Sequence, residues 1–194
     1  MVIEAAALAG WDSIDVFDDA PEKWGTSILG FTVRGPIDEC FHRPAERKIH
    51  CAIGSNRARY EISQKYRIQW ETIRHPAAIL SSSAVIGAGA FIGALVIVQS
   101  GARIGDQVIL NTGAIIEHDV DVLHHAHIAP GSILGGNVSV GEGCLIGLGA
   151  RILPGTRVGA WAQIGAGSVV VEEVPPQTTV AGVPARQLRQ GPAG

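Results

Sequence analysis

A strict six-residue repeat of apolar positions occupies residues 80–175. From Leu80 onward, the first residue of sixteen consecutive hexads is Leu, Ile or Val, with no shift in register. The fifth residue is always Ala, Val, Ser, Thr or Cys, and the second is Gly in eight of the sixteen hexads. A period of six matches neither the 3.6 residues of a helical turn nor the alternation of a half-buried strand. It is typical of a solenoid, in which short strands alternate with tight bends.

The repeat also predicts what each hexad position does. We expect the first- and fifth-position side chains to fill a thin interior. Glycine at the second position should relieve backbone crowding at the corners. Side chains at the third and fourth positions should point outward. On this pattern Trp161, at a fourth position, is expected to lie on the surface or at a contact between subunits.

The first 70 residues lack the six-residue period and predict a separate small α/β unit with a parallel sheet. A connector at 70–78 should lead into the first hexad, and residues 190–194 should form a frayed tail. The expected elements are helices at 2–8 and 57–66 and strands at 14–17, 28–33 and 48–53.

Composition excludes several classes of protein. Apolar residues make up 46% of the 194 residues, yet no uninterrupted apolar run reaches the length of about 18 needed to span a membrane. The net charge is −3 and no Lys/Arg block occurs, so we expect no nucleic acid partner and no membrane insertion. The start of the chain lacks the basic pattern of a secretory signal. Three cysteines without metal-ligand spacing, Cys40, Cys51 and Cys144, favour a reduced cytoplasm and predict no metal site.

Four of the seven histidines fall within ten residues, at His118, His124, His125 and His127. Histidine is the usual general base near neutral pH. His118 is the strongest candidate, because it stands at an outward third position between two carboxylates, either of which could orient the ring. These are Glu117 and Asp119. His124 and His125 are expected to be ordinary surface histidines.

The chain resembles the hexapeptide-repeat sugar acetyltransferases related to the sialic acid O-acetyltransferases and the bacillosamine-type nucleotide-amino-sugar N-acetyltransferases. The resemblance covers nearly the full chain and rests on the repeat and on four short motifs at 17–19, 53–56, 116–119 and 182–185. It implies a left-handed parallel β-helix with three hexads per coil, hence about five coils. It also implies two domains, a Rossmann-like nucleotide-sugar domain at 1–72 and the β-helix at 73–194.

The resemblance assigns roles to individual residues. It makes Asp119 the carboxylate that orients His118, and makes the Gly136 N–H the donor to the thioester oxygen. It places active sites between neighbouring chains of a homotrimer, which would let His118 and His127 meet from different subunits although they lie half a coil apart in one chain. Acetyl-CoA would contact His127, Gly136, Ile146, Gly147, Gly165, Val183 and Pro184, and the nucleotide-sugar acceptor would contact Asn111, Asp18, Asp19, Gly54 and Asn56.

One departure from the family concerns residues 1–5. They resemble the middle of the helix that follows the first strand and the Gly-rich phosphate loop of those proteins. We expect a start codon assigned too late rather than a lost nucleotide site, because Asp18, Asp19 and the turn at 54–56 are retained.

The sequence therefore predicts an acetyl-CoA-dependent acetyltransferase acting on a sugar, most simply on the 4-amino group of a nucleotide-linked 4-amino-4,6-dideoxy sugar. O-acetylation of a sialic-acid-type sugar is the first alternative. A zinc enzyme resembling the γ-class carbonic anhydrases is a further one, although no two of the four clustered histidines have the five-residue spacing of those ligands. A non-catalytic trimeric binding module is the last.

Overall fold

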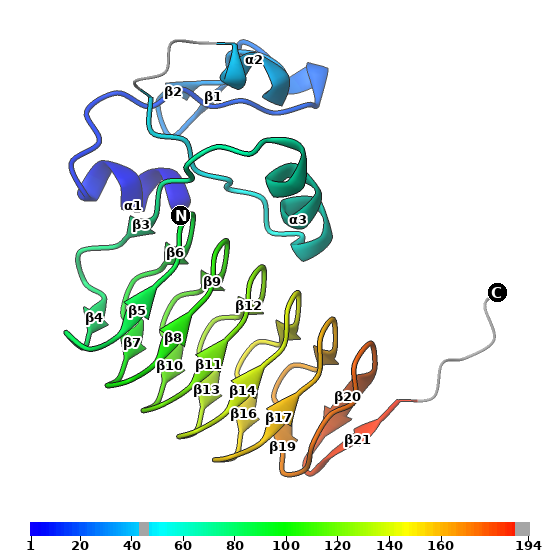
Figure 1. Ribbon diagram of the computed structural model, residues 1–194. Coiled ribbons are helices and arrows are strands. Elements are labelled where there is room, and N and C mark those ends of the chain that lie inside the picture. Colours follow the sequence, from blue (N-terminus) through cyan, green and yellow to red (C-terminus); the bar gives the residue numbers. More distant parts are fainter. Residues whose placement is uncertain (43–46, 189–194) are drawn as a thin grey trace, which may run out of the picture.

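The computed structural model describes residues 1–42 and 47–188. A β-solenoid of about six turns forms most of the molecule, and the first 70 residues lie across one flank at its N-terminal end (Figure 1). The predicted tail at 190–194 lies outside the described residues. No helix in the described ranges combines the length and apolar character needed to cross a bilayer.

The described part of the solenoid is a prism with three parallel sheets as its faces. We name them the six-, five- and eight-stranded faces. The six-stranded face contains Ile79–Leu80 (β4), Ile97–Val98 (β7), Ile115–Ile116 (β10), Ile133–Leu134 (β13), Arg151–Ile152 (β16) and Val169–Val170 (β19). The five-stranded face contains Val85–Ile86 (β5), Arg103–Ile104 (β8), Asp121–Val122 (β11), Ser139–Val140 (β14) and Arg157–Val158 (β17). The eight-stranded face contains Ile73–Arg74 (β3), Phe91–Ile92 (β6), Ile109–Leu110 (β9), His127–Ile128 (β12), Leu145–Ile146 (β15), Gln163–Ile164 (β18), Thr179–Gly182 (β20) and Ala185–Gln187 (β21).

Each strand pairs in parallel with the strand 18 residues further along. Ile97 pairs with Ile115, which pairs with Ile133. Three corners separate the faces, and we name each by the faces it joins, so that residues 117–120 lie at a six-to-five corner and 123–126 at a five-to-eight corner. The strand β20 ends the parallel stack, and β21 folds back on it antiparallel.

The interior confirms the predicted roles of the first and fifth hexad positions. Ile116 and Ile128, at first positions, and Ala114 and Val120, at fifth positions, are all completely buried. A polar residue is tolerated at a fifth position when it finds an acceptor, and the hydroxyl of Ser132 donates to the Gly147 carbonyl over 2.8 Å.

Two hexad positions set the corners. The second-position glycines relieve close approach, as predicted: a Cβ at Gly105 would lie only 2.8 Å from the His124 nitrogen of the next coil. The left-handed conformation falls instead on the fourth position, which the sequence analysis did not identify. Gly131 adopts it with φ +67°, and so do non-glycine residues such as Asp119 (φ +56°) and Asn137 (φ +59°).

The solenoid starts earlier than the repeat predicts. The predicted connector at 70–78 contains β3, which pairs with β6 and opens the first coil. The predicted count of about five coils is therefore too low. Arg74 occupies the first hexad position here and hides the pattern. At the open end of the prism this side chain is exposed, and its guanidinium donates to the Ala78 carbonyl.

The predicted N-terminal helices are confirmed, whereas most of the predicted strands are not. Residues 28–33 form a hairpin rather than one strand, because Leu29 (φ +51°) and Gly30 (φ +85°) make a two-residue turn. The segments 14–17 and 48–53 contribute single parallel bridges, Val16 to Val33 and Ile49 to Trp70. The described elements are Val2–Leu8 (α1), Pro21–Lys23 (η1), Ser27–Ile28 (β1), Phe31–Thr32 (β2), Ile37–Phe41 (α2) and Asn56–Lys65 (α3).

Helix α1 lies on the eight-stranded face. Its residues Ala5 and Ala6 are buried against Ile73 and Phe91 of the first two coils. Small side chains on this helix allow a close approach to the sheet. The helix thereby covers apolar outward positions that solvent would otherwise meet.

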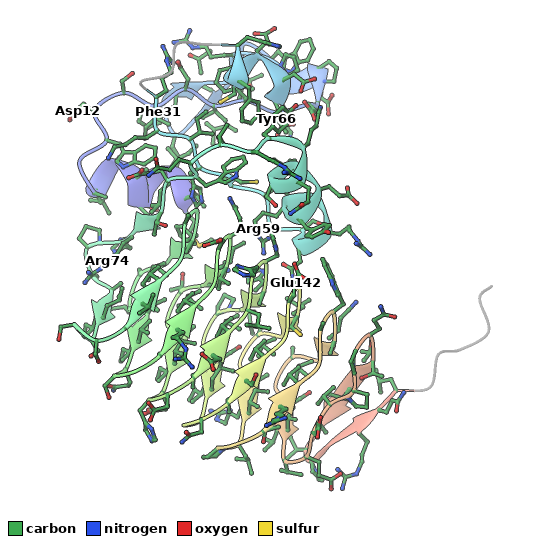
Figure 2. The ribbon with its side chains drawn as sticks, viewed as in Figure 1. Asp12, Phe31, Arg59, Tyr66, Arg74 and Glu142 are labelled. Carbon is green, nitrogen blue, oxygen red and sulfur yellow. The ribbon has the colours of Figure 1, made fainter. Side chains whose placement is uncertain are left out.

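Helix α3 docks on the five-to-eight corner through Arg59, which Figure 2 shows between the helix and the solenoid. Arg59 is 1% exposed, and its guanidinium donates to the carbonyls of Gln107 (2.8 Å) and His125 (2.7 Å), and to Ile53 within its own domain (3.0 Å). Burial lowers the pKa of Arg59 to about 10, so the side chain remains charged at neutral pH.

The same helix accounts for Trp161. Its ring makes an edge contact with Tyr60, with centroids 5.7 Å apart, and the Arg57 guanidinium lies 4.5 Å from its centroid. Trp161 thus packs against the N-terminal domain of its own chain. The expectation of a free surface or subunit contact is wrong, because a sequence pattern cannot show which outward side chains a second domain covers.

We expect Arg59→Met to destabilise the protein by about 2–4 kcal/mol, because buried carbonyls on two coils would lose their donor. The free energy of unfolding, measured in urea, checks this. The matched control is Arg57→Met on the same helix, which removes only an exposed cation–π contact and should cost about 1 kcal/mol or less. Equal effects of the two substitutions would contradict the docking role.

Candidate active site

His118 and Asp119 form a hydrogen-bonded pair at the six-to-five corner that follows β10. His118 Nδ1 lies 3.0 Å from Asp119 Oδ2, and the two side chains are 55% and 61% exposed. The ring points away from the prism, as its third position predicts. Of the two candidate carboxylates, Asp119 makes this bond rather than Glu117.

The partner of Nδ1 decides the protonation of the ring. An ionised carboxylate can only accept, so Nδ1 of His118 is assigned the proton. The lone pair of the neutral imidazole then lies on Nε2, which faces outward. A histidine held in this tautomer can take a proton from a nucleophile, and the carboxylate stabilises the imidazolium that results.

Gly136 lies one coil above His118 and next to its reactive nitrogen. A Cβ at Gly136 would fall 2.5 Å from His118 Nε2 and 2.6 Å from Cε1. Within the described part of the chain, the Gly136 N–H has no hydrogen-bond acceptor. The equivalent N–H of Ala88 is occupied, because it donates to Asp106 Oδ1. A free backbone donor beside a basic nitrogen is what an oxyanion site requires.

A second His–Asp pair, His124 with Asp106, lacks this arrangement. Its Nδ1 lies 3.6 Å from Asp106 Oδ2 but accepts the Asp106 backbone N–H over 2.9 Å. His124 therefore carries its proton on Nε2 and presents no outward lone pair. His125 is not a surface histidine as expected, because it is 5% exposed beneath α3 and bonds Ser63 Oγ over 2.8 Å.

Three other predicted residues meet between the two domains. Asn111 Nδ2 lies 3.2 Å from His127 Nε2, and the backbone of Gly54 hydrogen-bonds the same imidazole. Burial, and then the charge of Arg59, lowers the pKa of His127 to about 4. His127 is therefore neutral at physiological pH. It lies on the eight-stranded face, and His118 lies at another corner of the same chain.

Other predicted acceptor residues have structural partners. Asp18 accepts from Ala20 N–H and pairs with Lys23 over 2.7 Å, and the Lys23 bond is the main cause of its lowered pKa. Asp19 Oδ1 accepts the first N–H of α2, from Ile37, over 2.9 Å. The Asn56 amide donates to the Gly143 and Cys144 carbonyls and so helps to dock α3. Their contact with an acceptor stays a prediction.

The predicted acetyl-CoA contacts lie near the far end of the solenoid. Gly147 and Gly165 occupy successive turns of one eight-to-six corner, and Val183, before Pro184 in the β20–β21 turn, is 73% exposed. Ile146 is completely buried, so only its backbone could touch a cofactor. The described residues contain no group of three or more His, Cys, Asp or Glu placed to hold a metal ion.

Sequence reasoning missed Arg59. A lone arginine on a short helix resembles a solvated surface residue, and no periodicity shows that its head group reaches carbonyls 48 and 66 residues away. Its effect on the site is indirect. It holds Gln107 and His125, and with them the two coils that carry His118 and Asn111.

The buried neutral state of His127 predicts acid sensitivity. Between pH 6.5 and about 4 the unfolded chain binds a proton at His127 that the folded chain does not, so stability falls as pH falls through this range. His127→Gln should flatten the decline of the free energy of unfolding by up to about 1 kcal/mol per pH unit. Unfolding in urea at several pH values measures it. His42→Gln, at an exposed histidine, should keep the wild-type slope, and an unchanged slope in His127→Gln would contradict the assignment.

Comparison with known families divides the chain at the same place as the fold. Residues 1–66 match the PglD N-terminal domain. Residues 83–117 and 137–172 match the hexapeptide repeat of succinyl-transferase. The chain is also 49% identical over 74 residues to a serine acetyltransferase of Escherichia coli, a match that covers 37% of this chain and 27% of the length of that enzyme.

Solved structures cover nearly the whole chain. A variant of GDP-perosamine N-acetyltransferase from Caulobacter crescentus, in complex with CoA and GDP-perosamine, is 33% identical with a TM-score of 0.92, covering 97% of this chain and 91% of that one. The acetyltransferase domain of PglB from Neisseria gonorrhoeae, in complex with acetyl coenzyme A, is 37% identical with a TM-score of 0.90, covering 96% and 92%. The chain therefore belongs to the PglD-type family of hexapeptide-repeat, acetyl-CoA-dependent acetyltransferases.

Proposed function

We propose that the protein transfers the acetyl group of acetyl-CoA to the amino group of a nucleotide-linked 4-amino-4,6-dideoxy sugar. The observation that carries the proposal is the outward Nε2 lone pair of His118, set by Asp119 and lying beside the free N–H of Gly136. An amine acceptor is supported by two relatives, since the full-length matches include N-acetyltransferase structures with CoA and GDP-perosamine bound.

The reaction would proceed by direct transfer. The acceptor amine attacks the thioester carbonyl while His118 Nε2 takes one of its protons. Charge develops on the carbonyl oxygen, and the Gly136 N–H stabilises it. Collapse of the tetrahedral intermediate breaks the C–S bond, and the imidazolium returns its proton to the leaving thiolate. Asp119 keeps the ring in the correct tautomer throughout.

The surface around the pair suits two different substrates. Beyond Gly136 the six-to-five corner has a shallow open hollow of about 300 Å³, lined in part by Pro154, Gly155 and Glu172, which could take the arm of CoA. Gly147, Gly165, Val183 and Pro184 are the proposed contacts for the rest of that cosubstrate. The N-terminal domain, with Asp18, Asp19 and Gly54, is proposed to hold the nucleotide.

Self-association would complete the site, because His118 and His127 lie on different sides of one prism. The proposed homotrimer is supported by large apolar side chains left exposed on the single chain, including Ile79 (66%), Leu95 (66%) and Leu148 (59%). We expect sedimentation equilibrium to give three times the chain mass. A monomer with full activity would contradict a shared site.

A panel of UDP-, dTDP- and GDP-linked amino sugars with acetyl-CoA tests the function. We expect turnover on a 4-amino sugar and a loss of kcat of about 10²–10⁴-fold in His118→Ala, with little change in acetyl-CoA affinity. The matched control is His124→Ala, a similarly exposed histidine (53%) that should keep wild-type kcat.

The other outcomes of this panel identify the alternatives. Turnover on hydroxyl acceptors alone would indicate a sugar O-acetyltransferase. Binding of acetyl-CoA without turnover on any acceptor would indicate a non-catalytic module. An active His118→Ala would contradict the assigned base.

A further inference from the structure

The coil below the catalytic pair contains a glycine whose empty side-chain position is filled by a catalytic carboxylate. A Cβ at Gly101 would overlap Asp119 Oδ1 and lie 3.4 Å from Asp119 Cγ. The other oxygen, Oδ2, is the one that holds His118 Nδ1. We infer that Gly101 is a positioning residue for the His118–Asp119 pair, an inference that rests on the proposed function.

The backbone of Asp119 cannot move away from this neighbour. Its N–H donates to the Ser100 carbonyl over 3.0 Å, and its φ of +56° is fixed by the corner. The coil below is held in the same way, because the Gly101 N–H donates to Ser83 Oγ over 3.2 Å. Only the Asp119 side chain can give way if a methyl group appears at residue 101.

The corner conformation does not by itself demand glycine at residue 101. Gly101 has φ +71°, but Leu95, Gln107 and Asn137 stand at fourth positions with φ +58° to +59°. What distinguishes Gly101 is the group that a side chain would meet. At Gly131, by contrast, a Cβ would have nothing within 4 Å.

The consequence for a substitution is specific. A carboxylate can rotate at small cost in stability, so the fold should survive a methyl group at residue 101. Rotation would remove the acceptor from His118 Nδ1, and the ring would lose its fixed tautomer and orientation. The loss should therefore appear in kcat and not in folding.

The test compares Gly101→Ala with Gly131→Ala, which introduces the same strain at φ +67° without meeting a carboxylate. We expect Gly101→Ala to lower kcat by about 10- to 100-fold, with the KM for acetyl-CoA changed less than about twofold. Gly131→Ala should keep wild-type kcat, and the two variants should have the same midpoint of thermal unfolding. Wild-type kcat in Gly101→Ala would overturn the inference.

A double-mutant cycle separates positioning from general damage. In an Asp119→Gly background the carboxylate is gone, so adding Gly101→Ala should cause no further loss of kcat. If the two losses multiply, Gly101 does not act through Asp119 and the inference is wrong. Should Gly101→Ala fail to fold, Gly101→Asn and Gly131→Asn replace the pair, because Asn137 shows that asparagine adopts this conformation.

Failure of the inference is distinguishable from failure of the proposed function. If Asp119→Gly loses activity and Gly101→Ala does not, only the role of Gly101 is overturned. If Asp119→Gly keeps full activity, the catalytic pair itself is wrong and the role of Gly101 is overturned with it.

Discussion

The hydrogen-bonded register between successive coils is the constraint on which this molecule depends. Because every strand pairs with the strand 18 residues later, residues at that spacing are stacked. The stacking brings Gly136 above His118 and Gly101 beneath Asp119. A catalytic pair that is adjacent in sequence is thus shaped from above and below by residues remote from it. The backbone supplies the rigidity that a base and its orienting carboxylate need.

Three histidines show how position on this scaffold decides chemistry. His118 stands at an exposed corner and keeps a free basic nitrogen beside a carboxylate. His125 is covered by α3 and serves the contact between the domains. His127 is neutral because it is buried near the Arg59 guanidinium. The side chain is the same in each case, and the surroundings determine whether it can exchange a proton.

Much of the solenoid and the core of its site could be predicted from the sequence. Sixteen hexads in register define the interior, and an outward histidine between two carboxylates marks the candidate base. The choice of Asp119 over Glu117 required side-chain geometry. The N-terminal strands were poorly predicted because two of them form only single bridges, which leave no periodic signal. The first coil was missed because Arg74 replaces the expected aliphatic, and Arg59 because its acceptors are distant carbonyls.

A prism with an 18-residue pitch can change its length only in whole turns. Adding one complete turn beyond the hollow at Pro154 would lengthen the molecule and leave the geometry around His118 as it is. Adding a single hexad there would carry every later corner to the neighbouring edge, so that the exposed turn at Val183 would face a different side. Natural variation in this part of the molecule should therefore occur in steps of eighteen and not in steps of six.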